Sequence, residues 1–341
     1  MIQIEEATVV QLIAHRVGPD ETKVVVSSQL SEHTGAEEEE TFKKILLKPF
    51  SAHTATFEFQ HEIGLEYNVL FGIARSVLEE AELVENSRKI VQHLGAVSKH
   101  PQIREGDLFV AKFENVLFEN KHYKALGIYK FEDKDLYIET AATDREMELN
   151  FRRGIGSRKP DKACLIIFTE EPFTLLIIDS NSRETDYWQN DFIKHKPKND
   201  AVNNTHDFLG LTKDFITKQM PQDFQVSRAD QIDLLNRSVE YFKTHETFDK
   251  GGFEEEVFHH DNLIQSFRKF DHTYKQEQGV ELSDQFEISP QAVKKQARVF
   301  KSVLKLDKNF HVYIHGNREL IEQGVDEDGR KYYKIYYENE S

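Results

Sequence analysis

The chain has 341 residues, enough for about two domains that each bury a core. Hydrophobic residues make up 38% and charged residues 30%, which indicates a soluble globular protein, and the single cysteine, Cys164, excludes an internal disulfide and a cysteine-rich zinc site. The formal net charge of −16 argues against nonspecific wrapping of long DNA, because each neutralised phosphate needs a cation. We expect a cytoplasmic protein, since we find no secretory leader and no uncharged run near the ~18 residues that cross a bilayer.

The first elements mix strands and helices. Residues 7–29 predict two strands around a turn at Gly18-Pro19-Asp20. Residues 37–50 begin with glutamates and end with lysines, an order that the helix dipole favours. Between Tyr67 and Leu94 apolar residues recur at nearly helical spacing. We therefore expect a helix in the first of these stretches and one long or two shorter amphipathic helices in the second.

Residues 107–180 have the character of a sheet. Five strand-like runs, DLFVAKFENVLF, HYKALGIYKF, KDLYIET, KACLIIFTE and TLLIIDS, are separated by short polar turns. Connections this short leave no room for crossover helices, so the sheet should be mostly antiparallel. We predict an α+β domain with such a sheet over residues 1–195.

The pattern becomes helical over residues 196–341. Ser227 and Asp230 form a Ser-x-x-Asp cap signature, and Ser289-Pro290 is a strong helix start. The tail runs NFHVYIHG and RKYYKIYYE predict an aromatic strand pair. The expected fold is thus α+β, with a mostly antiparallel N-terminal sheet and helices, followed by a largely helical C-terminal domain that ends in a β-hairpin.

Positive charge gathers in three segments of this acidic chain. The first is a loop over residues 152–162, whose Gly154 and Gly156 permit backbone conformations that expose N–H groups to an anion. The second is the lysine-rich stretch 194–198, and the third is a helix from Pro290 whose cations share one stripe. The candidate nucleic-acid contacts are Arg152, Arg153, Arg158, Lys159, Lys162, Lys194, Lys196, Lys198, Lys294, Lys295, Arg298, Lys301 and Lys305. The alternative is a solvated surface that acids from elsewhere neutralise.

Catalytic patterns are absent from the sequence. His259 and His260 are expected in mid-helix, where neighbouring side chains point about 100° apart and do not suit joint metal ligation. The triplet Glu132-Asp133-Lys134 resembles the acid-x-Lys motif of metal-dependent nucleases, but it falls at a polar turn between strands. We therefore predict no catalytic residue, no metal site and no cofactor, and a nuclease is the less favoured alternative.

Two stretches carry a resemblance to a known family. RKPDKACLIIF (158–168) is a basic segment that leads into an apolar strand, and YWQNDFIKHKPKNDAVNNTHDFLG (187–210) is an aromatic, lysine-rich segment before a helix. Together they resemble the bacterial nucleoid-associated protein family called NdpA-like or YejK-like. This resemblance implies a cytoplasmic protein found with the bacterial chromosome, with DNA binding and without catalytic residues.

Two hypotheses follow for the function. The leading one is a non-enzymatic nucleoid-associated protein that binds double-stranded DNA through local basic patches. The other is a protein-interaction module that a DNA-processing partner recruits to the nucleoid, because residues 1–150 hold 16 Lys or Arg against 27 Asp or Glu, a net of −11 that would attract basic proteins. The sequence allows a homodimer, and we expect no membrane partner.

Overall fold

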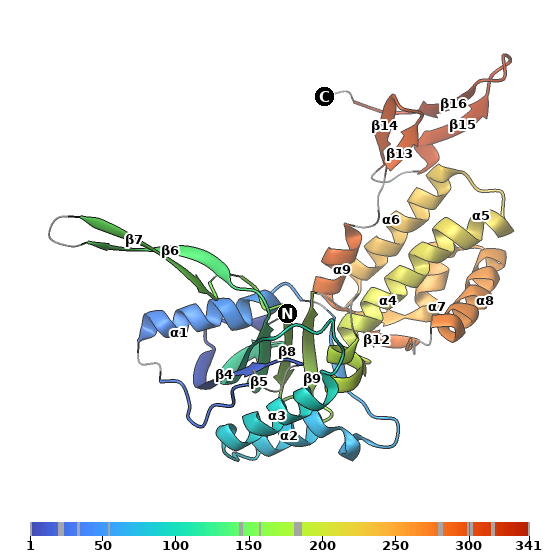
Figure 1. Ribbon diagram of the computed structural model, residues 1–341. Helices are drawn as coiled ribbons and strands as arrows, with labels where there is room; N and C mark the ends of the chain where they lie inside the picture. Colours follow the sequence, from blue (N-terminus) through green and yellow to red (C-terminus); the bar gives the residue numbers. More distant parts are fainter. Residues whose placement is uncertain are drawn as a thin grey trace. The chain divides into compact units, whose positions relative to one another are not determined.

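The computed structural model describes residues 2–19, 24–32, 35–53, 55–142, 146–156, 158–180, 186–278, 282–298, 300, 303–314 and 318–339. The chain divides into two compact units, residues 1–198 and 199–341 (Figure 1). The first is built around an antiparallel sheet and the second mainly from helices. The predicted α+β class, with its helical C-terminal half and its final β-hairpin, is therefore confirmed.

The sheet of the first unit has the strand order β1-β4-β5-β8-β9-β3-β10, with β2 also paired to β4. Its strands are β1 (Ile2–Gln3), β2 (Thr8–Val17), β3 (Phe57–Phe59), β4 (Gly106–Phe118), β5 (Lys121–Phe131), β8 (Lys162–Ile167), β9 (Thr174–Asp179) and β10 (His195–Pro197). Every recorded pair between them is antiparallel, as the short turns predict.

Helices cover both faces of this sheet. On one face, α2 (Val69–Leu78), α3 (Leu83–Val97) and the π-helical turn η5 (Tyr187–Ile193) enclose a core that includes Leu126 and Ile128 of β5. On the other face lies the segment α1 (Ala36–Phe42), η2 (Lys43–Leu47) and η3 (Lys48–Phe50), and its apolar residues pack with Ala125 and Tyr129. Strand β8 is buried at every position because it lies between the two cores.

A two-stranded hairpin interrupts the sequence between β5 and β8. It consists of β6 (Asp135–Ala142) and β7 (Met147–Gly154), which pair over their whole length. The first of these strands was expected, but the second was not, because Arg152, Arg153 and Gly154 were assigned to a loop. The alternation of polar and apolar residues in MELNFRRG fits a strand better than a loop.

Other expectations for the first unit need smaller corrections. Of the two strands expected over residues 7–29, β2 forms, and in the described residues 24–29 Val25 makes an isolated bridge to Arg16 instead of a second strand. Between Tyr67 and Leu94 no correction is needed, because the second of the two expected alternatives, two shorter helices, is confirmed; they are interrupted where Glu80 takes a positive φ of 68°.

The second unit packs helices around phenylalanine. Its helices are α4 (Ala201–Asp214), η6 (Phe215–Gln219), α5 (Met220–Asp223), α6 (Arg228–Thr244), α7 (Lys250–Phe253), η7 (Glu254–Phe258), α8 (Asp261–Gln278), α9 (Pro290–Ala297) and η8 (Arg318–Leu320). The ring of Phe208 lies 4.2 Å from that of Phe248 and 5.3 Å from that of Phe253, between centroids. Strand β11 (Thr247–Asp249) pairs with β12 (Gln285–Glu287) beside this core.

Two small hairpins end the second unit. Strand β13 (Val303–Leu306) pairs with β14 (Phe310–Tyr313), and β15 (Ile321–Val325) pairs with β16 (Lys331–Ile335). The two aromatic runs of the tail, which were predicted to form one strand pair, therefore lie in different hairpins. Leu304, Ile314 and Ile321 form a small core with two residues of α6.

Two helices of the second unit begin directly after the cap residues that the sequence predicts. Ser227 and Asp230 form the capping box of α6, and the Ser289 side chain accepts from Ala292 N at the start of α9. The expectation that His259 and His260 lie in mid-helix is wrong. His259 takes a φ of 59° after η7, and α8 begins at Asp261.

Asn68 is a buried polar residue that ties three segments of the first unit together. Its side-chain oxygen accepts from Phe71 N and caps α2. Its amide nitrogen donates to the carbonyls of Gln60, Ile193 and Lys194 at 3.0, 2.9 and 3.1 Å. These bonds hold the start of α2 against the end of η5, and through them against the 194–198 segment.

We predict that Asn68→Ala lowers the free energy of unfolding of the first unit by about 3 kcal/mol, because it removes a helix cap and leaves buried carbonyls unsatisfied. The change can be followed by fluorescence during denaturation, since Trp188 is the only tryptophan of the chain and is buried in the first unit. Asn150→Ala on the exposed strand β7 is the control and should change stability by less than about 0.5 kcal/mol. Equal effects of the two substitutions would contradict the proposed role of Asn68.

Candidate nucleic-acid interface

The cations at the start of the first basic segment lie on the hairpin. Arg152 and Arg153 point to opposite faces of β7, because neighbouring residues of a strand alternate. The guanidinium of Arg152 forms an ion pair with Glu139 on the opposite strand. Arg153 donates to the Lys134 carbonyl at 3.4 Å and is exposed. Arg153 thus keeps its charge available at the surface, while that of Arg152 is neutralised.

The rest of this segment lies at the base of the hairpin. Arg158 contacts the carboxylates of Asp133 and Asp161, each at 3.2 Å. The pKa of Arg158 is raised; burial opposes this rise, and the charges and hydrogen bonds of these carboxylates cause it. Lys159 is exposed. Among the cations of this segment, Arg153 and Lys159 are therefore better placed than Arg158 to meet a phosphate.

Lys162 is buried at the first position of β8, with its side chain 2% exposed. Its Nζ lies 2.6 Å from Asp179 Oδ1, and 5.2 Å from the centre of the Tyr187 ring. A buried ammonium needs such a partner, since desolvation of an unpaired charge is costly. The expectation that Lys162 contacts DNA is therefore wrong, because its side chain points into the first unit and its charge is balanced there.

A second buried lysine lies beside it. Lys130 Nζ is 2.9 Å from Glu132 Oε1 and 3.1 Å from the Tyr187 hydroxyl, and it donates to the Arg104 carbonyl at 2.6 Å. Burial lowers the pKa of Lys130, and the paired charge of Glu132 opposes that shift. Sequence reasoning missed this pair, although a lysine inside an apolar strand, as in IYKF, is a usable signal.

The two acids of the acid-x-Lys triplet Glu132-Asp133-Lys134 form ion pairs in this region. Glu132 is buried against Lys130, and Asp133 lies 3.2 Å from Arg158 and 3.7 Å from Arg104. The described residues contain no group of three His, Cys, Asp or Glu that could hold a metal ion. The triplet lies at the turn between β5 and β6, where it was expected, and its two acids pair there with Lys130, Arg104 and Arg158.

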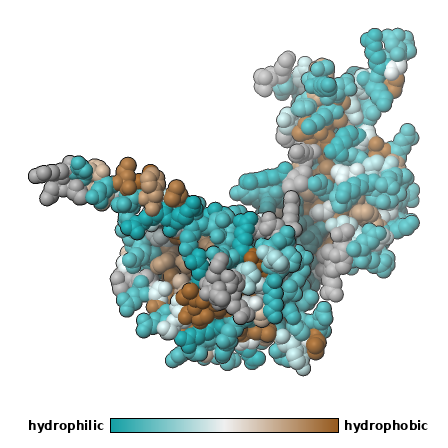
Figure 2. Space-filling view, viewed as in Figure 1, coloured by the Kyte–Doolittle hydropathy of each residue, from teal (hydrophilic) through white to brown (hydrophobic). Residues whose placement is uncertain are grey.

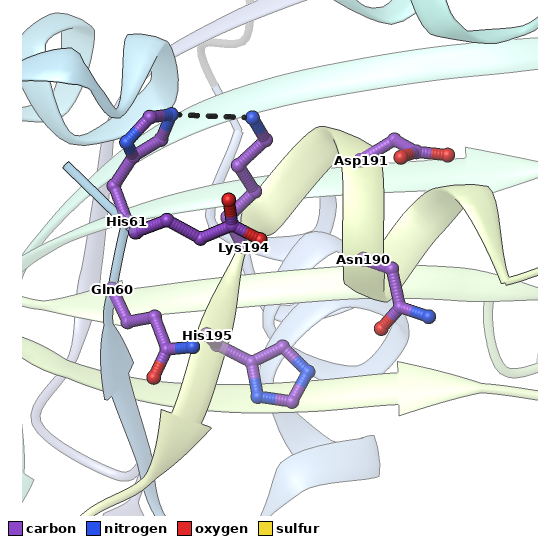
Figure 3. A pocket seen from close by; sticks show the side chains of 7 residues that line it. Gln60, His61, Asn190, Asp191, Lys194 and His195 are labelled. Carbon is purple, nitrogen blue, oxygen red and sulfur yellow. Dashed lines mark hydrogen bonds between the residues drawn. The ribbon is translucent and has the colours of Figure 1, made fainter.

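The second basic segment borders a pocket of about 290 Å³ in the first unit (Figure 3). Lys194 ends η5 in the left-handed conformation, and its Nζ lies 3.4 Å from His61 Nε2. His195, the next residue, also lines the pocket, and burial lowers its pKa to about 4. At neutral pH His195 is thus uncharged, so Lys194 is the lining residue that brings positive charge.

Two acidic side chains offset the positive charge of Lys194 in this pocket. Glu62 and Asp191 line the same pocket, which leaves it without the positive excess that a phosphate site needs. Farther along β10, Lys196 pairs with Glu58 at 3.1 Å, and Lys198 donates to Thr174 Oγ1 at 2.5 Å. The lysines of this segment are consequently engaged within the first unit.

The third segment differs from the predicted helix. Helix α9 ends at Ala297, and Lys305 lies on strand β13. Leu304, which was expected to continue the apolar stripe of the helix, instead packs in the small core beside α6 while its strand pairs with β14. Pairing with an aromatic strand overrides helical spacing here, so the predicted stripe of four cations does not form as one helical face. Lys301 lies outside the described residues.

The remaining cations of this segment are exposed. Lys294 and Arg298 are four residues apart and share a side of the last turn of α9, and Lys295 lies between them. Within the described ranges, Lys294, Arg298 and Lys305 have no ion pair. The structure thus brings Lys294, Lys295 and Arg298 together at one helix end, whereas most candidate cations of the first unit are held there by ion pairs or hydrogen bonds.

These features define a class of protein. The chain is an α+β protein whose described part carries exposed cations at one helix end. In the same part of the chain, no helix is long and apolar enough to cross a membrane.

The chain belongs to the family described as nucleoid-associated protein YejK, whose family model matches residues 13–338. This match confirms the resemblance seen in the sequence, and the family is not an enzyme family. No curated protein and no solved structure gives a significant match.

We predict that Lys162→Met destabilises the first unit by about 3–5 kcal/mol, because it leaves the carboxylate of Asp179 buried without its partner. Lys159→Met, three residues earlier at an exposed position, is the matched control and should change stability by less than about 0.5 kcal/mol. Trp188 fluorescence during denaturation measures both. The double substitution Lys162→Met, Asp179→Leu should recover part of the loss, and a single Lys162 variant as stable as the control would refute the structural role.

Proposed function

We propose that the protein is a non-enzymatic, nucleoid-associated protein that binds double-stranded DNA directly. The phosphate contacts are assigned first to the exposed cations Lys294, Lys295, Arg298 and Lys305 of the second unit. The observation that carries the proposal is the exposure of Lys294, Arg298 and Lys305 without an ion pair in the described residues. Membership in a nucleoid-associated family supports this role, and with it a location on the chromosome in the cytoplasm.

The local sequence strengthens the assignment. From Ile288 to Arg318 the chain holds seven Lys or Arg and one acid, Asp307, although its net charge is −16. Binding to DNA depends on cations that displace counterions from phosphates, whereas acids elsewhere repel the duplex. A small positive surface on an acidic protein should therefore give DNA binding that is local and sensitive to salt.

The cations of the first unit are assigned a lesser role. Arg153 and Lys159 are exposed and can add phosphate contacts. The charges of Arg152, Arg158 and Lys196 are balanced by carboxylates, so binding through them would require breaking ion pairs. The side chain of Lys194 lies at hydrogen-bonding distance from His61, and that of Lys198 donates a hydrogen bond to Thr174. We therefore expect substitutions in the first unit to weaken DNA binding less than those in α9.

An interaction module recruited by a DNA-processing partner is the second candidate. The glutamates in the first turn of α1, Glu37, Glu38 and Glu39, favour it, because such an acidic surface attracts basic proteins, and Glu37 and Glu38 are exposed. Affinity capture from lysate, with and without nuclease treatment, separates the two functions. Partners retained after the DNA is destroyed would favour the module.

We predict that the triple variant Lys294→Gln, Arg298→Gln, Lys305→Gln weakens duplex binding and reduces the salt dependence of the affinity. Each lost phosphate contact should lower the log–log slope by about 1, so the slope should fall by about 3. Fluorescence anisotropy with a labelled duplex at several salt concentrations measures both quantities. If the wild-type protein shows no affinity at low salt, direct DNA binding is excluded.

The control removes the same charge from other places in the second unit. Lys218→Gln, Lys243→Gln and Lys334→Gln replace lysines that pair with Asp214, Glu240 and Glu322. This triple variant should bind nearly as well as the wild-type protein. Equal losses in the two variants would assign the effect to net charge and remove α9 and β13 from the site.

A further inference from the structure

The β6–β7 hairpin projects from the sheet of the first unit as an arm (Figure 1). Every described residue from Asp135 to Phe151 is exposed. Each strand has eight residues, and the recorded pairs of both strands are with each other only, within the described part of the chain. An isolated two-stranded hairpin is only marginally stable in water, so a long one implies additional support.

The register divides the arm into two unlike faces. Residues paired across an antiparallel ladder share a face, and alternate residues of a strand do so too. One face, here called the apolar face, consists of Leu136, Ile138, Thr140, Ala142, Met147, Leu149, Phe151 and Arg153. The other carries polar residues such as Glu139, Glu148, Asn150 and Arg152. The arm is thus amphipathic like a strand pair that packs against a core, but without a core beneath it.

The apolar face is open to solvent. Ile138, Leu149 and Phe151 are 54%, 61% and 66% exposed, and Leu136 and Met147 are exposed to a similar degree. Figure 2 shows hydrophobic side chains along the arm, between more polar ones. A contiguous exposed apolar surface of this kind in a soluble protein usually marks an interface.

Charge argues that the occupant is a protein rather than DNA. The described strands of the arm hold three acids, Asp135, Glu139 and Glu148, against Arg152 and Arg153. Such an arm has no excess of positive charge for a phosphate backbone, and the apolar face offers a duplex only the single cation Arg153. A protein surface that is itself apolar is the complementary partner.

The shape of the apolar face favours an identical arm. Along β6 its side chains decrease in size from base to tip, from Leu136 and Ile138 to Thr140 and Ala142. On β7, Met147 and Leu149 stay large toward the tip, so two arms stacked head to tail about a two-fold axis bring apolar side chains together along the whole face. Two-fold interfaces require this kind of self-complementarity.

The area is sufficient for a specific dimer. Each of the five large apolar side chains leaves about 100 Å² or more accessible to solvent, so one apolar face offers about 500–600 Å². Two faces packed together would then bury about 1,000 Å² or more, which is near the lower limit for a specific interface. We propose that the protein is a homodimer in which the apolar faces of two β6–β7 arms pack against each other, antiparallel, about a two-fold axis. This inference does not depend on DNA binding.

We predict that wild-type protein sediments and scatters light as a dimer of the 39.8-kDa chain in the absence of DNA. The variant Leu149→Thr, Phe151→Thr should dimerise at least about a hundredfold more weakly, because it removes four apolar side chains from a two-fold interface. Threonine is chosen because its high strand propensity preserves the arm. A wild-type monomer at tens of micromolar would overturn the proposal and assign the apolar face to a different protein.

Tyr137→Thr is the matched control. Tyr137 is also a large exposed side chain of β6, but it lies on the opposite face. Its replacement should leave the dimer unchanged. A dimer that survives the Leu149/Phe151 variant, or that is lost equally in the Tyr137 variant, would exclude the apolar face as the interface.

Cross-linking gives an independent test. The one native cysteine, Cys164, is fully buried, so an introduced cysteine on the arm is the accessible thiol. Thr140→Cys lies near the centre of the apolar face, and Ala141→Cys lies next to it on the opposite face. A short bifunctional thiol reagent should link two copies through position 140 and not through position 141. Equal linking at both positions would contradict face-to-face packing.

Discussion

The first unit depends on placing two lysine charges inside a sheet that is otherwise apolar. Lys130 and Lys162 each pair with a buried carboxylate, and both ammonium groups lie over the ring of Tyr187. Because an unpaired ammonium there would be strongly destabilising, strands β5, β8 and β9 must meet η5 in one arrangement. Asp161 completes this region by accepting from the backbone N–H of Glu132. The base from which the arm emerges is fixed by the same contacts.

The sequence predicts the fold where signals are local. Short turns between apolar runs predict the antiparallel sheet, and side-chain caps at Ser227 and Ser289 predict the starts of α6 and α9, because these features act within a few residues. The end of α9 was missed because the competing partner, β14, contributes contacts that helical spacing does not reveal. The same holds for β7, whose ladder with β6 outweighs the basic, glycine-containing character of its end.

The sequence predicts which segments of the candidate site are basic, but it does not predict which of their cations form ion pairs. The sequence identifies which segments are basic, yet whether a cation is available depends on acids brought close by folding, as Glu139 is to Arg152 and Glu58 to Lys196. Lys162 illustrates the limit, since its partner Asp179 is seventeen residues away on a neighbouring strand. For Lys162, which lies at the start of its strand, the tertiary fold was needed to show that the lysine is buried.

The phenylalanine core of the second unit has a practical consequence. The rings of Phe248 and Phe286 stack, and the ring of Phe208 packs at a tilt against Phe248, within an apolar interior, so burial of hydrocarbon is a large part of what holds these helices together. Ordinary salts screen charges strongly and affect such a core little. The helical unit should therefore keep its shape across a wide range of ionic strength, while cooling should weaken it, since the hydrophobic contribution declines at low temperature.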